Sequence, residues 1–122
     1  MLTRILVCED DVDTAKALCR HIDDIPNHES VMLVKQNSPG FVMDSIVEAI
    51  ERFSPKYAII DGLYGSWQTV AKLAVETDPN IIPIILSGDE NTVKLAQNAG
   101  YTAFSKPSDG DALFKYITDK KR

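Results

Sequence analysis

The chain has 122 residues, of which 44% are hydrophobic and 25% are charged, an ordinary balance for one globular domain. Its formal net charge of −5 argues against direct binding to nucleic acid, and no apolar run approaches the roughly 20 residues of a membrane span. The N-terminus also lacks the layout of a signal peptide, because carboxylates interrupt it early. These features exclude a basic nucleic-acid-binding domain and a membrane-embedded one, and we expect a cytoplasmic protein.

The first strand–helix pair lies at the N-terminus. Residues 4–8 form a short β-branched run that is apolar on both faces, which is typical of a buried parallel strand. A helix follows, because apolar residues recur at spacings of three and four before Pro26: Val12, Ala15, Leu18, Cys19, Ile22 and Ile25. Cys8 and Cys19 belong to these apolar patterns, so we expect both to be buried free thiols.

The alternation of strand and helix patterns continues to the C-terminus. Four further strands are predicted as short apolar runs, at 30–36, 57–60, 81–86 and 101–104. A helical pattern follows each of them, with its apolar stripe within 41–53, 70–75, 89–99 and 113–117. Ser66 and Ser108 are candidate N-caps of the third and fifth helices, and Gly100 is the candidate C-cap of the fourth.

Five strand–helix pairs in strict alternation predict an α/β fold. Its sheet is expected to be a doubly wound, five-stranded parallel sheet with helices on both faces. There are no internal repeats, low-complexity tracts or linkers in the sequence. Residues 1–122 are therefore expected to form a single domain without an output domain.

Polar residues follow four of the five predicted strands. The carboxyl ends of parallel strands form the usual site of such a fold. The residues there are Glu9, Asp10 and Asp11 after the first strand, Asp61 after the third, Ser87 after the fourth, and Lys106 and Pro107 after the fifth. Each has an ordinary structural explanation, such as helix capping for Asp11, a turn for Ser87 or a solvated surface position for Lys106. Their coincidence at four strand ends favours a shared site.

The residue types suit metal-dependent phosphoryl transfer. Carboxylates gathered within a few ångströms need a counter-charge, and Mg²⁺ (or Mn²⁺) binds oxygen ligands while keeping several waters. Asp61 is the candidate nucleophile, which would form an acyl phosphate. Asp10 and Asp61 would hold the metal, and Lys106 and the Ser87 hydroxyl would bind the phosphoryl oxygens.

Four motifs, RILVCEDD, YAIIDG, IIPIILSG and FSKP, occur in this order along the chain. In this order they resemble the receiver domain of two-component response regulators, over essentially the whole length. The resemblance implies a flavodoxin-like fold with strand order 2-1-3-4-5. It implies that Glu9 and Asp10 bind the metal together with the backbone carbonyl of Leu63, and that Asp61 is the phosphorylated residue.

The same resemblance assigns the remaining site residues and the partners. Ser87 matches the switch hydroxyl and Lys106 the phosphate-binding lysine, and Pro107 matches the residue that a cis peptide bond usually joins to that lysine. A histidine kinase, a phosphotransfer protein or a small acyl phosphate would phosphorylate Asp61. Signalling would occur through a downstream protein partner that binds the fourth helix and fifth strand. The protein would assist its own phosphorylation rather than act as an enzyme, as a monomer or a phosphorylation-dependent dimer.

The chain departs from the usual receiver pattern in three respects. The position three residues before the lysine is normally aromatic but is Ala103 here, so Phe104 becomes the candidate switch aromatic, with Tyr101 further back. The loop DGLYGSW lacks the usual proline, and the intervals between the third, fourth and fifth strand motifs are a few residues shorter than in most relatives. The departures leave open a receiver-like adaptor that binds partners without being phosphorylated.

Enzyme classes fit the sequence less well. Hydrolases of the haloacid-dehalogenase kind also place a nucleophilic aspartate after a strand, but their second aspartate is replaced here by Leu63 and a cap domain does not fit this length. Neither a dinucleotide-binding Gly-rich motif nor a P-loop motif occurs. His21 and His28 lie in or after the first predicted helix, away from the strand ends, and are expected to have no catalytic role.

Overall fold

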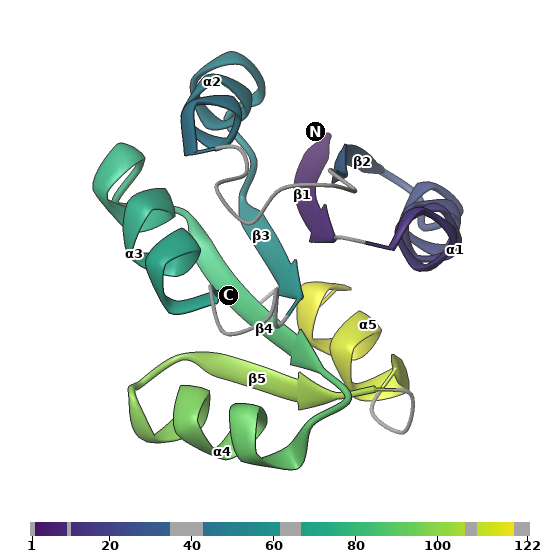
Figure 1. The fold of residues 1–122 in the computed structure, drawn as a ribbon. Coiled ribbons are helices and arrows are strands. Elements are labelled where there is room, and N and C mark those ends of the chain that lie inside the picture. The colour runs from purple at the N-terminus through teal and green to yellow at the C-terminus, as the bar shows by residue number, and fades with distance from the viewer. Residues whose placement is uncertain (1, 10, 35–42, 62–66, 107–109, 119–122) are drawn as a thin grey trace.

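The fold was obtained as a computed structural model that describes residues 2–9, 11–34, 43–61, 67–106 and 110–118. Within these ranges five strands and five helices alternate (Figure 1). The strands are β1 (Thr3–Glu9), β2 (His28–Val34), β3 (Tyr57–Asp61), β4 (Ile82–Ser87) and β5 (Thr102–Ser105). The helices are α1 (Val12–Asp23), α2 (Met43–Phe53), α3 (Trp67–Thr77), α4 (Glu90–Asn98) and α5 (Gly110–Thr118). None of these helices has the length and apolar character that crossing a membrane requires.

The strands form one parallel sheet in the order β2-β1-β3-β4-β5. The predicted α/β fold and its strand order are therefore confirmed. In the register of the central strands, Val7 lies opposite Ile59, and Ile59 lies opposite Ile84. Since the strands point the same way, the carboxyl ends of β1, β3, β4 and β5 lie along one edge of the sheet.

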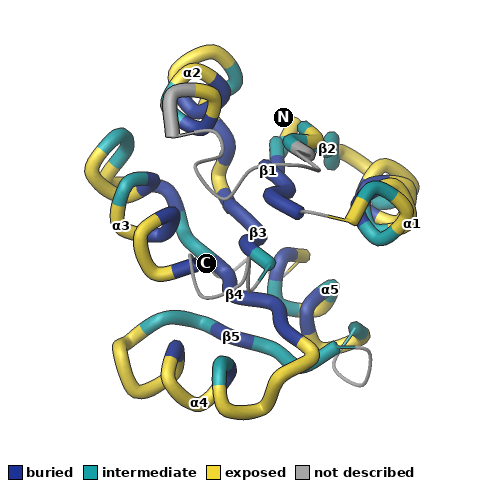
Figure 2. Tube along the Cα trace, viewed as in Figure 1, coloured by how far each residue is buried: buried dark blue, intermediate teal, exposed yellow. Residues whose placement is uncertain are grey.

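Helices cover both faces of the sheet, with α2, α3 and α4 on one face and α1 and α5 on the other (Figure 1). Successive residues of a strand point to opposite faces, so each central strand contributes to two apolar clusters. The strand members on the α1 and α5 side are Ile5, Val7, Tyr57, Ile59, Ile84 and Leu86. Those on the other side are Leu6, Cys8, Ala58, Ile60, Ile85 and Ala103. In Figure 2 the central strands are accordingly dark blue along most of their length, whereas the helices are buried only on their inner sides.

The predicted bounds of β1, β3, β4 and β5 differ from the structure by one residue, and two other boundaries differ by two residues. The β2 strand begins at His28 rather than at residue 30, because its parallel pairing with β1 extends back to Thr3. The α1 helix ends at Asp23 rather than at Ile25, and the chain reverses through Asn27, whose φ of 64° lies in the left-handed region. The candidate caps Ser66 and Ser108 lie outside the described residues.

Both cysteines are buried and free, as predicted. Burial raises the pKa of the Cys8 thiol to about 12. Because the thiolate is the reactive form of cysteine, Cys8 serves as a small apolar side chain of the core.

The α4 helix ends at the predicted glycine through a pair of backbone hydrogen bonds. Gly100 has a φ of +93°, its N–H donates to the carbonyl of Gln97, and the next N–H, that of Tyr101, donates to the carbonyl of Ala96. This pattern is a Schellman motif, which satisfies carbonyls that a helix end would leave unpaired. It also turns the chain into β5, from which Lys106 follows.

Replacing Gly100 by alanine should destabilise the protein by about 1–2 kcal/mol, because an L-residue is strained at this φ. No atom lies within 4 Å of the position that the new Cβ would occupy, so the loss reports backbone conformation alone. Gly88→Ala is the matched control, since Gly88 also has open space around it and its φ is not in that positive range. The free energy of unfolding, measured in urea, should fall by this amount in Gly100→Ala and by less in Gly88→Ala. Equal losses in both variants would contradict the interpretation.

Candidate functional site

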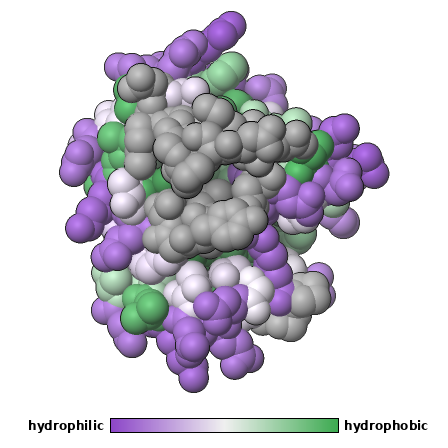
Figure 3. Space-filling view, viewed as in Figure 1, coloured by the Kyte–Doolittle hydropathy of each residue, from purple (hydrophilic) through white to green (hydrophobic). Residues whose placement is uncertain are grey.

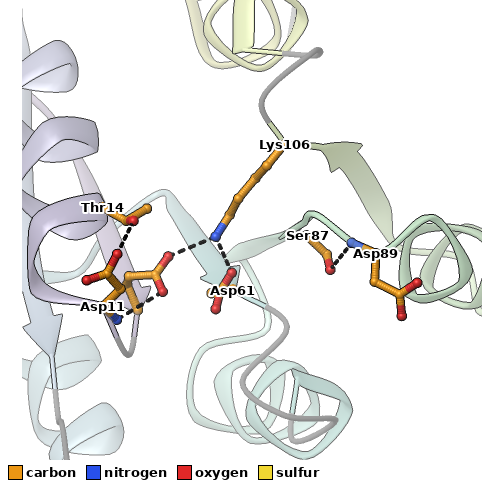
Figure 4. Close-up of polar contacts among 7 residues, drawn as sticks. Asp11, Thr14, Asp61, Ser87, Asp89 and Lys106 are labelled. Carbon is orange, nitrogen blue, oxygen red and sulfur yellow. Dashed lines mark hydrogen bonds and ion pairs between the residues drawn. The ribbon is translucent and has the colours of Figure 1, made fainter.

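The predicted site residues that the structure describes lie at one edge of the sheet. Glu9 is the last residue of β1, Asp61 the last of β3 and Ser87 the last of β4, and Lys106 directly follows β5. A backbone hydrogen bond of 2.8 Å from the N–H of Lys106 to the carbonyl of Ser87 continues the pairing of β4 and β5. Figure 4 shows the Lys106 side chain reaching from the end of β5 toward Asp61.

The Lys106 ammonium lies between two carboxylates. Its Nζ donates to Oε2 of Glu9 at 3.0 Å and also to Oδ1 of Asp61. The Glu9 side chain is only 3% exposed, compared with 16% for Asp61 and 26% for Lys106. A carboxylate as deeply buried as Glu9 needs a paired cation, and Lys106 supplies it.

The surroundings of Lys106 favour its charged form. Burial by itself lowers the pKa of Lys106, but its hydrogen bonds to Asp61 and Glu9 and the attraction of both charges outweigh burial and raise the pKa above the ordinary value. The site therefore holds a permanent cation at neutral pH. Such a cation is suited to binding the oxygens of an anionic ligand.

The second oxygen of Glu9 is bound to the start of α1. Oε1 of Glu9 accepts the backbone N–H of Asp11 at 3.2 Å. Asp11 occupies the N-cap position of α1 as predicted, but its carboxylate makes no capping bond to the helix backbone. Instead, Oδ2 of Asp11 accepts the hydroxyl of Thr14 at 2.5 Å, because the Thr14 side chain rises from the first turn toward it.

Ser87 connects the site to α4. The Ser87 side chain is buried, and its Oγ accepts the backbone N–H of Asp89 at 3.1 Å. Asp89 in turn caps α4, because its carboxylate accepts the N–H of Asn91 and the hydroxyl of Thr92. A hydroxyl that accepts one hydrogen bond still has its own proton to donate, so Ser87 can bind an oxygen at the site.

Ala103 and Phe104 lie on opposite faces of β5. Ala103 is buried in the cluster under α2, α3 and α4. Phe104 packs in the cluster under α1 and α5, where its ring meets Tyr116 edge-on with a centroid distance of 5.9 Å. The role of Phe104 as a switch aromatic stays a prediction, and any such switch would act on α5 rather than on α4.

Three predicted site residues, Asp10, Leu63 and Pro107, lie outside the described residues. Among the residues that the structure does describe, no group of three or more His, Cys, Asp or Glu side chains could hold a metal ion. The two described carboxylates, those of Glu9 and Asp61, are nevertheless the oxygen donors that Mg²⁺ accepts, since this ion commonly takes one or two carboxylates and keeps its waters. The donor chemistry fits the predicted metal.

A groove beside the site was not predicted. It lies between α1 and α5, has a volume of about 440 Å³ and is lined mainly by apolar side chains, including Leu18, Leu86, Leu113 and Phe114. His21 lines it as well and its ring lies 5.4 Å from that of Phe114, so it has a packing role away from the carboxylates. Helical periodicity identified the apolar faces of both helices, but it does not reveal how closely two such faces approach.

No protein-family model and no curated protein sequence matches the chain. Solved structures do match it. The response regulator domain of CheB from Thermotoga maritima aligns with a TM-score of 0.71 at 20% identity, covering 96% of this chain and 94% of that one. A response regulator receiver protein from Sinorhizobium medicae gives a TM-score of 0.70 at 18% identity, covering 96% and 92%. A protein described as a pilus-assembly CpaE protein, from Burkholderia thailandensis, gives 0.68 at 19% identity, covering 97% and 100%. The chain thus has the receiver fold that the sequence motifs resemble.

The pKa of Lys106 leads to a prediction for stability at high pH. This pKa is higher in the folded chain than in the unfolded chain. The stabilisation that the charged Lys106 gives the fold is therefore fully present below pH 10.5, and it is lost as the pH rises through the pKa of Lys106 in the folded chain. The difference in unfolding free energy between the wild type and Lys106→Met should therefore stay level from neutral pH to about 10 and shrink above it. Urea unfolding of both proteins at several pH values across this range measures the difference. Lys94→Met, at an exposed position of α4, is the control, and the same alkaline decline in both comparisons would refute the assignment to Lys106.

Proposed function

We propose that this protein is a response regulator receiver that is phosphorylated on Asp61 in a Mg²⁺-dependent reaction and signals by binding another protein. The observation that carries the proposal is the Lys106 ammonium held against the Asp61 carboxylate at the carboxyl edge of the sheet. The buried Ser87 hydroxyl on the neighbouring strand end supports it. The structural likeness to receiver domains, with the same strand order, is consistent with this chemistry.

With a small acyl phosphate as donor, the proposed reaction is a transfer of the phosphoryl group between two carboxylates. An oxygen of Asp61 attacks the phosphorus of an acyl phosphate, the bond between phosphorus and the acyl oxygen breaks, and the electron pair leaves with the acid anion. Since Oδ1 of Asp61 accepts Lys106, we assign the attack to Oδ2. The product is a mixed anhydride on Asp61, and no proton has to be moved.

Charge develops on the oxygens of the transferred group, and the described residues can receive it. The Lys106 ammonium is already within hydrogen-bond distance of Asp61, so a small movement brings it to a phosphoryl oxygen. The Ser87 hydroxyl can donate to another. A Mg²⁺ ion bound by Asp61 and the acids at the end of β1 would supply the remaining positive charge.

The conformational change that follows phosphorylation would reach α4 through Ser87. If Ser87 moves toward the phosphoryl group, its bond to the Asp89 N–H is lost, and Asp89 caps α4. A shift of the start of α4 would change the surface offered to a partner. Leu95 of α4, which is 61% exposed, is an apolar contact for such a partner on the otherwise polar outer face of this helix. Figure 3 shows that hydrophilic side chains dominate the described surface of the face in that view.

The partners implied by this proposal are a cytoplasmic histidine kinase or phosphotransfer protein as donor and a downstream protein as target. The protein would work as a monomer or as a phosphorylation-dependent dimer. A second candidate is the adaptor that binds partners without phosphorylation. It is favoured by Ala103, because a small buried residue at this position leaves α4 without the usual aromatic contact to change.

Intact-mass measurement after incubation with acetyl phosphate and Mg²⁺ tests the proposal. The wild type should gain one phosphoryl group, and Asp61→Asn should gain none, because an amide oxygen is too poor a nucleophile. Chelating the metal with EDTA should prevent the adduct in the wild type as well.

Circular dichroism of each sample serves as the control for folding. An adduct in Asp61→Asn would place the phosphoryl group elsewhere. The absence of an adduct in folded wild-type protein would favour the adaptor.

A further inference from the structure

The β2 strand lies at one end of the sheet, with β1 on one side and no strand on the other (Figure 1). Successive residues of a strand direct their backbone N–H and C=O groups to opposite sides. The N–H of Thr3 in β1 donates to the carbonyl of Asn27, so the odd-numbered residues of this segment face β1. Four residues of β2 therefore direct their backbone groups away from the sheet: His28, Ser30, Met32 and Val34.

The chain covers only the first half of this outer side. The N–H of His28 donates to the carbonyl of Ile25, and the N–H of Ser30 donates to Oδ1 of Asp23 at 2.7 Å. For the N–H of Met32, the next in the series, no such acceptor exists in the part of the chain that the structure describes. An uncovered strand edge is a ready site for pairing with another strand, and here it begins at Met32.

The side chain of Met32 is exposed beside this open edge. It is a large apolar side chain with 45% of its surface accessible. It lines a hollow of about 410 Å³ between α1 and β2, together with Cys19 and Ser30. A strand added along the edge would place alternate side chains beside Met32, because side chains on one face of neighbouring strands lie next to each other. The hollow can therefore receive side chains of such a strand.

Two cations line the same hollow from α1. Lys16 and Arg20 are exposed, lie one helical turn apart and make no ion pair among the described residues, although the chain has a net charge of −5. Like charges at this spacing slightly destabilise a helix, so the free protein bears a cost for this pair. A negative charge placed in the hollow would remove that cost.

The cations lie toward the open part of the edge. The α1 helix returns from the carboxyl end of β1 to the amino end of β2, so its earlier residues Lys16 and Arg20 lie toward the carboxyl half of β2. The acids of the hollow, Asp23 and Asp24, come at the end of the helix, where Asp23 covers the edge. The open edge and the unpaired positive charge therefore coincide.

We propose that the carboxyl half of β2 binds an extended, acidic segment of another protein by strand addition. The backbone groups of Met32 and Val34 pair with the segment, and its carboxylates lie over Lys16 and Arg20. Main-chain hydrogen bonds supply affinity in this mode of recognition, and the side-chain contacts supply the preference for acidic residues. The surface is at the opposite end of the sheet from β5, and its use requires no phosphoryl group on Asp61.

Fluorescence anisotropy with labelled peptides tests the proposal. The probe is an acetylated seven-residue peptide in which valine and glutamate alternate, and the matched probe has lysine in place of each glutamate. The acidic probe should bind saturably and the basic probe at least about tenfold more weakly, because like charges would meet at Lys16 and Arg20. Equal affinity for both probes, or no saturation by the acidic probe at about 1 mM, would overturn the proposal.

Charge variants locate the binding site. Lys16→Gln combined with Arg20→Gln should weaken binding of the acidic probe at least about fivefold. Lys72→Gln combined with Lys94→Gln is the matched control, because it removes the same charge from exposed positions of α3 and α4, and it should change the affinity less than about twofold. Equal losses in the two double variants would show general attraction to an acidic peptide and would refute this site.

A variant of the strand itself has a control of the same kind. Met32→Glu should abolish binding of the acidic probe, because it places a negative charge at the edge. Val75→Glu, at an exposed apolar position of α3, should leave the binding unchanged. If Met32→Glu binds the acidic probe as tightly as Val75→Glu, the edge of β2 is not the site.

Hydrogen exchange of individual amides tests strand addition directly. Saturation with the acidic probe should slow exchange at Met32 and Val34 at least about tenfold, and it should leave His28 and Ser30, which are already bonded, unchanged. Unchanged exchange at Met32 and Val34 would mean that the probe binds through charge alone, which overturns the proposal. Slower exchange at these amides with rising protein concentration and no probe would identify a second copy of the chain as the occupant instead, which overturns it as well.

Discussion

The interaction on which the site depends is the sharing of one ammonium group by two carboxylates. Glu9 is buried as an anion, and a buried anion destabilises a fold unless a cation and hydrogen-bond donors surround it. Lys106 meets this requirement only because β1, β3, β4 and β5 are neighbours in the sheet, so that residues 97 positions apart in the chain come into contact. The strand order, the backbone bond from Lys106 to Ser87 and the start of α1 all serve to bring these charges together.

Each strand end adds a different function to this edge of the sheet. The end of β3 carries the candidate nucleophile, and the end of β4 carries a hydroxyl that is connected to the cap of α4. The end of β5 carries the cation. Because the three groups sit on adjacent strands of a tightly packed sheet, their spacing is set by the backbone rather than by loops. A change at one strand end therefore reaches its neighbours through short, direct contacts.

Much of this could be predicted from the sequence. The β-branched apolar runs predicted the buried strands. Parallel strands share one carboxyl edge, which placed four site residues together: Glu9, Asp61, Ser87 and Lys106. The start of β2 was misplaced because pairing with β1 sets it, and a sequence pattern does not contain the partner strand. The bond between Lys106 and Glu9 depends on how far two side chains reach, which spacing does not reveal. The opposite faces of Ala103 and Phe104 do follow from the alternation along a strand, but the face that α4 covers became visible only in three dimensions.

The position of Trp67 has a consequence for spectroscopy. It is the single tryptophan of the chain, it opens α3 six residues after Asp61, and it is buried with its ring edge-on to Tyr101 at 5.9 Å between centroids. Tyr101 belongs to the motif that ends α4. Trp67 thus joins the start of α3 to the end of α4, the helix whose start is connected to Ser87. Its intrinsic fluorescence is a built-in, label-free optical reporter of that contact.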